Sequence, residues 1–324
     1  MARTPARAPL TDPVFEGVAA AKGHYESYYL RAVAPDRARA VWIRYTIHKP
    51  PGGAAVGSLW CTLFDDDGAP PRAVKQTFSS PLGTRWIEIG GCTFGPGYAE
   101  GDVEALGHTG HWELRFGEGD GAVLHLPRPW MYTARLPRTK TLSPVSDTVF
   151  SGHVEVDGHR VDLDGWRGMV GHNWGAEHAE RWIWLHGIAF EDAPDAWVDL
   201  VAGRIRVGPA TLPWIANGVL HVDGVRHVLG GIGAVRSTSV SETPLRATLV
   251  IPPAELEITS PRDQIATWVY ADPGGSEHHS AHCSVAALEV RLGDRVLRTG
   301  HGACFELGMR ETDHGLRVQP FPDG

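Results

Sequence analysis

The chain has little cysteine, and the four that are present lie far apart at positions 61, 92, 283 and 304. No two of them form a Cys-x-x-Cys pair, so the spacing argues against a zinc knot and against a disulfide framework. Isolated cysteines of this kind are typical of free thiols in a reducing compartment. We therefore expect a cytoplasmic protein whose covalent structure adds no cross-links to its core.

The chain also lacks an excess of positive charge and any long apolar run. Thirty Lys and Arg residues are outnumbered by 38 Asp and Glu residues, which gives a net charge of -8. A nucleic-acid partner would require a basic face, so we expect none. No apolar stretch approaches the roughly 18 residues of a membrane span, and residues 1–13 contain no apolar core of a secretory signal. We predict no transmembrane segment.

A third absence is that of a long amphipathic helix, since the best local candidate is a turn or two at 176–181. Strand patterns are common instead, as in residues 41–48, where Val41, Ile43, Tyr45 and Ile47 would share one face. The turns between such runs are rich in Gly and Asp, as at residues 65–68, and the chain has 39 Gly and 24 Pro. This pattern predicts an all-β protein built of sandwiches or barrels.

A length of 324 residues corresponds to about two domains. The Pro-rich residues 1–19 are expected to form a flexible N-terminal arm. We place the boundary between two β-barrels of similar size in the middle of the chain. The expected barrels comprise residues 20–176 and 177–324.

What the chain has in excess is tryptophan, with 12 residues, and it is concentrated in the central segment 168–186. This segment contains three Trp, three His and two Glu, which combine flat apolar rings with groups that exchange protons. Alternation along a strand would place His172 and Trp174 on one face. It would likewise place Trp182, Trp184 and His186 together. Such a surface suits an apolar small molecule, although a Trp-rich core whose polar groups are satisfied locally would have the same composition.

Three motifs together resemble those of one protein family. They are the opening Glu26-x-x-Tyr29-x-Arg31, the segment His172-Asn173-Trp174-Gly175, and Trp182-x-Trp184. In order and spacing they are similar to the hydroxyneurosporene synthase (carotenoid 1,2-hydratase), AttH-like and tocopherol cyclase-like proteins. One departure is Gly171, where the hydratases tend to carry Asp next to the histidine.

The resemblance implies two lipocalin-like β-barrels packed side by side, with a ligand cavity near their junction. It also implies hydration, cyclisation or ring closure on isoprenoid-like or polyketide-like molecules, without an organic cofactor. Glu26 and Arg31 of the opening motif are expected to pair and close the first barrel.

The candidate catalytic residues are His172, Asp199 and Glu177. Asp199 interrupts an apolar strand at 196–201, so its carboxylate must be either paired or functional. His172 could instead donate a ring nitrogen to a strand carbonyl, and Glu177 could form a solvated ion pair. The residues expected to line the substrate cavity are Trp174, Trp182, Trp184, His186, Trp197 and Tyr29.

Two functions remain open from the sequence. The first is a cofactor-independent cyclase, hydratase or isomerase that acts on a hydrophobic small molecule in a Trp-lined cavity. The alternative is a lipocalin-like protein that binds such a molecule without chemistry. A metal-dependent enzyme is disfavoured, because His279 and His282 would face opposite sides of a regular strand, and we expect no metal and no cofactor. The sequence is compatible with a homodimer and does not fix the oligomeric state.

Overall fold

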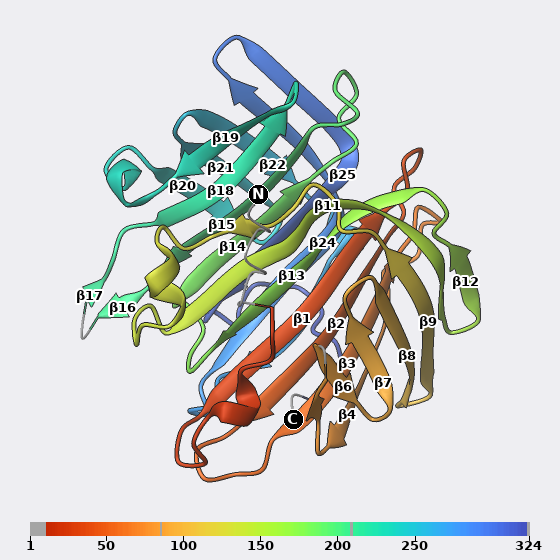
Figure 1. The fold of residues 1–324 in the computed structure, drawn as a ribbon. Helices are drawn as coiled ribbons and strands as arrows, with labels where there is room; N and C mark the ends of the chain where they lie inside the picture. Colours follow the sequence, from red (N-terminus) through yellow and green to blue (C-terminus); the bar gives the residue numbers. More distant parts are fainter. Residues whose placement is uncertain (1–10, 85, 208–209, 323–324) are drawn as a thin grey trace, which may run out of the picture.

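The structure is a computed structural model, and it describes residues 11–84, 86–207 and 210–322. Two large curled antiparallel sheets lie side by side (Figure 1). Helical structure among these residues is limited to short 3-10 turns, so the all-β prediction is confirmed. No helix in the described ranges is long and apolar enough to cross a membrane.

The first sheet contains 13 strands in the order β4-β3-β2-β1-β13-β11-β9-β8-β7-β6-β5, with β10 and β12 paired to β11. It curls until β4 returns against β8 and β9. Its strands are β1 (His24–Val33), β2 (Ala40–Lys49), β3 (Val56–Phe64), β4 (Arg72–Ser79), β5 (Leu82–Gly83), β6 (Ile87–Ile89), β7 (Cys92–Gly95), β8 (Tyr98–Ala105), β9 (His108–Phe116), β10 (Val123–Leu124), β11 (Thr139–Val156), β12 (His159–Asp162) and β13 (Trp166–Gly175).

The second sheet contains ten strands in the order β19-β18-β15-β14-β25-β24-β22-β21-β20, with β23 paired to β24. Its strands are β14 (Arg181–Gly187), β15 (Trp197–Arg204), β18 (Ile215–Val222), β19 (Val225–Gly230), β20 (Ser239–Thr243), β21 (Arg246–Ile251), β22 (Ala254–Thr259), β23 (Ala266–Ala271), β24 (Glu277–Leu292) and β25 (Arg295–Met309). The short strands β16 (Arg206–Val207) and β17 (Ala210–Thr211) form a separate pair. The four 3-10 turns are η1 (Phe15–Gly17), η2 (Pro129–Tyr132), η3 (Ile232–Ala234) and η4 (Arg262–Gln264).

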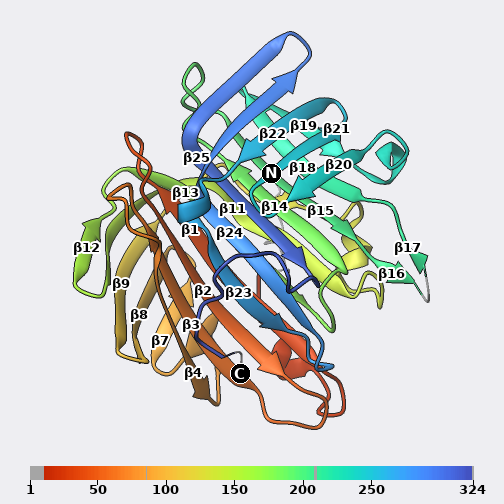
Figure 2. The same cartoon turned by 180° about the vertical axis from the view of Figure 1, so that it is seen from behind.

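The central strands β1 and β2 are buried on both faces, which explains why β1 lacks a polar face in the sequence. Tyr28 and Tyr45 point into the first barrel, where each contacts the ring of Phe94. Arg44 and Trp42 point the other way, and their partners include Tyr270 and Trp268 of the second sheet. Seen from behind, β23 and β24 lie alongside β1 and β2 (Figure 2). The two sheets therefore bury one continuous junction between them.

Two connecting segments differ from expectation. Residues 176–180, between β13 and β14, form bends and no helix, so the predicted helical turn at 176–181 is wrong. The described part of the N-terminal arm is anchored, because the side chain of Phe15 is buried and the amides of Val14 and Phe15 donate hydrogen bonds to Glu26. This contrasts with the flexible arm that the sequence indicates for residues 1–19. Residues 1–10 lie outside the described ranges.

Candidate functional site at the junction of the two sheets

Alternate side chains of β1 and β14 form the middle of the junction. Tyr29 on β1 meets Trp184 on β14 edge to face, with ring centroids 5.0 Å apart. Both side chains are buried, and burial raises the pKa of Tyr29 well above its usual value, so its hydroxyl stays protonated. The structure therefore brings together two of the predicted lining residues from opposite domains.

Arg31 connects the two sheets through hydrogen bonds. Its guanidinium donates to the carbonyl oxygens of Ser284 at 2.7 Å and Gly302 at 3.0 Å, and it lies 3.1 Å from Nδ1 of His186. His186 Nε2 lies 3.1 Å from the carbonyl oxygen of Ser146, which can only accept. The proton therefore sits on Nε2, and burial lowers the pKa of His186 to about 3. Arg31 and the neutral imidazole of His186 therefore connect the two sheets through hydrogen bonds. The expected pair of Glu26 and Arg31 does not form.

Asp199 is directly opposite His186 on the neighbouring strand β15. Its side chain is fully buried, and neither carboxylate oxygen has a hydrogen-bond partner in the described part of the chain. The imidazole of His125 lies beside it, with Nε2 at 3.4 Å from Oδ2. Burial raises the pKa of Asp199, but the neighbouring polar side chains, His125 first and then His186 and Ser143, together outweigh it and hold the pKa below its usual value. An ionised carboxylate without hydrogen bonds is costly in a protein interior.

The imidazole of His125 is held in one orientation. Its Nδ1 lies 3.3 Å from the carbonyl oxygen of Asn217, so Nδ1 carries a proton, while Nε2 lies 3.2 Å from Ser143 Oγ. Nε2 is then the nitrogen that faces Asp199. His125 comes from the connection between β9 and β11, far from the central segment, and the sequence offered no motif that would have identified it.

One end of the junction holds a small cavity of about 20 Å³, which is space for about one water molecule. Arg44 lies at this end, with its guanidinium 4.3 Å from the ring centroid of Tyr270 and its Nε donating to Ser27 Oγ at 2.8 Å. The lining residues come from both domains: Tyr25, Glu26, Arg44, Thr46, Ile47, His48, Trp60, His178, Tyr270 and Ala271. Aromatic rings and a buried cation therefore meet at this end.

Glu306 on β25 lies among the same aromatic side chains. It accepts hydrogen bonds from Trp182 Nε1 at 2.9 Å and Tyr270 Oη at 3.4 Å, and it lies 3.2 Å from Nδ1 of His282. Burial raises the pKa of Glu306, but the hydrogen bond and charge of His282 outweigh it and lower the pKa. Trp182, an expected lining residue, therefore uses its N–H for a hydrogen bond within the second sheet and stacks on Tyr270.

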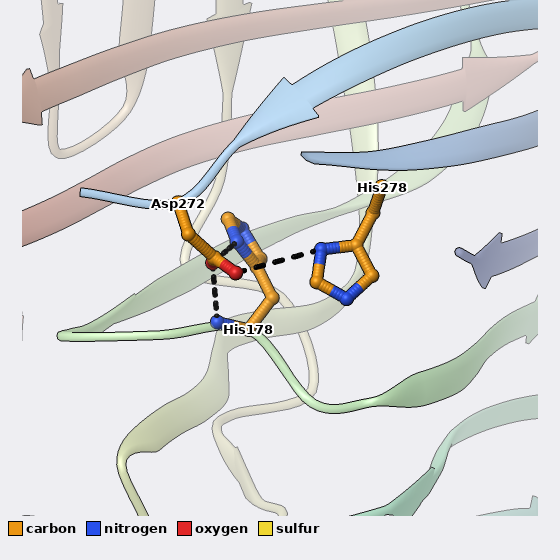
Figure 3. A group of neighbouring side chains, drawn as sticks. All are labelled: His178, Asp272 and His278. Carbon is orange, nitrogen blue, oxygen red and sulfur yellow. Dashed lines mark hydrogen bonds and ion pairs between the residues drawn. The ribbon is translucent and has the colours of Figure 1, made fainter. Parts of the chain in front are cut away.

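A second group of polar side chains lies near the small cavity, comprising His178, Asp272 and His278 (Figure 3). Asp272 Oδ1 accepts from the backbone N–H of His178 at 2.8 Å and lies 2.7 Å from its Nδ1. Burial raises the pKa of Asp272, yet the bond and charge of His178 lower it to about 2. Burial lowers the pKa of His278 to about 4. No pattern in the sequence suggested that the segments carrying His178 and His278 would meet.

His172, a predicted catalytic residue, lies inside the first barrel on the face of β13 away from the junction. Its ring is stacked between Tyr28 at 4.1 Å and Trp174 at 4.5 Å, and its Nε2 lies 2.9 Å from Glu26. Burial raises the pKa of Glu26, but the bonds from His172 and His24 lower it to about 2. His172 and Trp174 do share a face, as expected, yet that face belongs to the barrel interior.

Gly171, where the hydratases tend to carry Asp, has a steric explanation. It pairs with Tyr29 across β1 and β13, and a Cβ on Gly171 would lie 2.1 Å from Cζ of the Tyr29 ring. Any side chain at this position would displace Tyr29 from the junction. The departure from the family pattern is therefore coupled to the position of the tyrosine.

The remaining predicted residues occupy different places. Glu177 forms an ion pair with Arg138 at the surface and does not line the small cavity, so its position does not support a catalytic role. Trp197 is buried and donates from Nε1 to Asp120 at 2.9 Å. Trp174 packs with Tyr132 in a separate small core cluster.

A larger cavity of about 390 Å³ opens at the other end of the junction, where β1 ends. Its described lining contains no tryptophan: Val33, Pro35, Arg167, Ile188, Ala189, Phe190, Glu191, Pro194, Gly300 and His301. A volume of this size falls within the range of small-molecule sites. The expected Trp-lined cavity is therefore not this one.

No family model matches the chain. An uncharacterized protein of Mycobacterium tuberculosis is 26% identical over 304 residues, which is 90% of this chain and 88% of that protein, with the same figures in strains H37Rv and CDC 1551. The likeness supports common descent, but the relative is uncharacterized and therefore suggests no activity for this chain.

Solved structures resemble the chain over nearly its whole length. The AttH-type protein of Nitrosomonas europaea has a TM-score of 0.59 at 12% identity and covers 95% of this chain and 98% of its own. Kievitone hydratase of Nectria haematococca has a TM-score of 0.60 at 9% identity, with 94% of both chains covered. The chain has the AttH-like double-lipocalin-like fold. CghA, which has also been solved with Sch210972, gives a TM-score of 0.56 at 12% identity and covers 89% of this chain and 88% of its own.

Proposed function

We propose that the protein catalyses proton transfer on an apolar small molecule held at the junction, as a lyase or isomerase without an organic cofactor. The main supporting observation is the fully buried Asp199 carboxylate, which lacks hydrogen bonds from the described residues and lies beside the fixed imidazole of His125. Buried polar groups that lack hydrogen-bond partners are found preferentially at functional sites. The AttH-like fold gives further support, because kievitone hydratase is by its name a hydration enzyme.

In the proposed reaction, Asp199 takes a proton from a substrate carbon and His125 Nε2 gives a proton to a second atom of the substrate. Proton removal and proton donation together produce an isomerisation, or the loss of water when the second atom is a hydroxyl oxygen. The reverse sequence is a hydration. General acid–base catalysis of this type contributes about 10²–10⁴-fold to a rate.

The walls of the junction suit an apolar substrate. The rings of Tyr29 and Trp184 lie at its centre, and Arg44 with Tyr270 lies at its aromatic end. Indole and phenol faces stabilise cationic intermediates by about 0.5–2 kcal/mol each when water is excluded. Such walls stabilise the positive charge that develops when an alkene is protonated.

The test is native mass spectrometry of the purified protein, followed by extraction and identification of any bound apolar molecule. The wild type and the Asp199→Asn variant are compared, with the exposed Asp192→Asn as the matched control. We expect Asp199→Asn to retain the substrate and the other two proteins to retain product, so that the molecules are isomers or differ by one water. The same molecule in all three proteins would favour the binding-protein alternative.

A further inference from the structure

His178, Asp272 and His278 come from three places in the chain and meet at one point (Figure 3). His178 lies in the connection between β13 and β14, Asp272 follows β23, and His278 is the second residue of β24. Each side chain offers one ligand atom, and these atoms lie within 4.8 Å of one another. This cluster involves none of the residues that the proposed acid–base reaction uses.

His278 has an unusual environment for a buried imidazole. The residue is fully buried, and neither Nδ1 nor Nε2 has a hydrogen-bond partner among the described residues. The Nδ1 atom lies 3.7 Å from Asp272 Oδ2, which is too far for a hydrogen bond. A neutral imidazole carries one N–H donor and one acceptor, and leaving both unsatisfied in the interior is costly. A bound cation would take up the acceptor nitrogen.

The spacing of the donor atoms fits a metal ion. Zinc bonds to histidine and aspartate are about 2.0–2.2 Å long, so neighbouring tetrahedral ligand atoms lie about 3.3 Å apart. The two distances here, 2.7 Å between His178 Nδ1 and Asp272 Oδ1 and 3.7 Å between His278 Nδ1 and Asp272 Oδ2, lie on either side of that value. An ion would fit after small shifts of the side chains.

We propose that His178, Asp272 and His278 form a site for one divalent transition-metal ion of the zinc type. Two imidazoles and one carboxylate are donors that favour such ions over Mg²⁺ and Ca²⁺, which select oxygen ligands. Three protein ligands leave a further coordination position for water or another small ligand. The sequence argued against a metal, because spacing along one strand tests only neighbours such as His279 and His282.

Neighbouring groups already orient these ligands. Asp272 Oδ2 accepts a hydrogen bond from Ser276 Oγ at 2.7 Å, and the ring of His178 stacks on Tyr25 at 3.9 Å and on Trp182 at 5.5 Å. Outer partners of this type fix the geometry of metal ligands. The ion would join the connection between the two domains to the turn before β24, and His178 also lines the small cavity of the junction.

The experiment measures metal binding by the full-length chain after chelator treatment and dialysis. Zn²⁺ is titrated against a chromophoric chelator, and Co²⁺ is added as a spectroscopic probe. We expect one Zn²⁺ per chain and the intense visible absorption of tetrahedral Co²⁺. In His278→Ala and in Asp272→Asn we expect the affinity to fall at least about 100-fold. X-ray absorption of the zinc-loaded wild type should show nitrogen ligands of the imidazole type.

The matched control is His108→Ala, because His108 and Asp157 form a 2.8 Å His–Asp pair that no third metal ligand joins within the described ranges. This variant should bind Zn²⁺ as the wild type does. Zinc binding that survives in both site variants, or an octahedral all-oxygen Co²⁺ spectrum in the wild type, would overturn the proposal. So would the absence of stoichiometric binding. Should the site variants fail to fold, the wild-type spectra alone decide. None of these outcomes bears on the reaction proposed for Asp199.

Discussion

Two buried imidazole–carboxylate pairs, one inside the first barrel and one at the junction, differ in how their carboxylates are bonded. Glu26 accepts hydrogen bonds from the amides of Val14 and Phe15 and lies 2.9 Å from His172. Asp199 beside His125 receives no hydrogen bond at either oxygen from the residues that the structure describes. All four side chains are buried, so burial does not distinguish the pairs. We propose from this difference that the first pair holds the fold and that the second is available for chemistry.

The largest expected effect is on turnover, which should distinguish the two imidazole–carboxylate pairs. With the molecule recovered from the protein as substrate, Asp199→Asn should lower turnover by about 10²–10⁴-fold, because the amide cannot take a proton. His172→Gln should keep most of the turnover, since its side chain lies inside the barrel. Steady-state rates of both folded variants are the measurement. Equal losses in the two variants would make the barrel interior part of the active site.

The next effect concerns the anchor between the sheets. Arg31→Met removes the donor to the carbonyl oxygen of Ser284 and to Nδ1 of His186, whereas the carbonyl oxygen of Gly302 keeps the amide of Ile188 as a donor. Each buried acceptor left unsatisfied costs about 1–3 kcal/mol, so we expect the free energy of unfolding to fall by at least about 2 kcal/mol. Urea denaturation measures it. The control Arg37→Ala, which removes an exposed ion pair with Asp66, should leave the free energy of unfolding close to that of the wild type. Equal losses would contradict the role of Arg31.

The structural role of Glu26 predicts a pH dependence. Its pKa falls from 4.5 in the unfolded chain to about 2 in the folded one, so its stabilisation is complete above pH 4.5 and is lost as the pH falls toward 2. The shift corresponds to about 3 kcal/mol. Glu26→Gln should therefore be less stable than the wild type near pH 7, and the difference should vanish near pH 2. Denaturation curves across this range are the measurement, and a difference independent of pH would refute the assignment.

The smallest effect tests how Gly171 positions Tyr29. Gly171→Ala places a methyl group against the tyrosine ring, and overpacking of this kind costs about 1–3 kcal/mol. The control is Gly233→Ala, where an added Cβ meets no described atom within 4 Å. Thermal unfolding of the two variants gives the comparison. A stable Gly171→Ala protein would show that Tyr29 can move without penalty.

Much of the fold could be predicted from the sequence, because alternation and turn residues are local properties. The residues 41–48 illustrate this, since Tyr45 points into the barrel as the pattern indicates. The helix expected at 176–181 does not form, because this short segment links two sheets and Glu177 and Arg181 bind distant partners, Arg138 and Glu242. Local propensity was overridden there by tertiary contacts.

The site was predictable only in part. Tyr29 and Trp184, both expected to line a cavity near the barrel junction, do meet there, and the isolated acid in an apolar strand drew attention to Asp199. The partner His125 is 74 positions away and arrives through a connection that follows β9, so no spacing rule could reveal it. His172 was misplaced for a related reason, since alternation shows which residues share a face and not which side that face is on.

The most direct test of the junction as the reaction site is a crystal structure of Asp199→Asn with the molecule that it retains. We predict that the molecule lies between the two sheets, in contact with Tyr29 and Trp184 and within hydrogen-bonding distance of His125 Nε2. A molecule found inside the first barrel, against His172 and Glu26, would contradict the account.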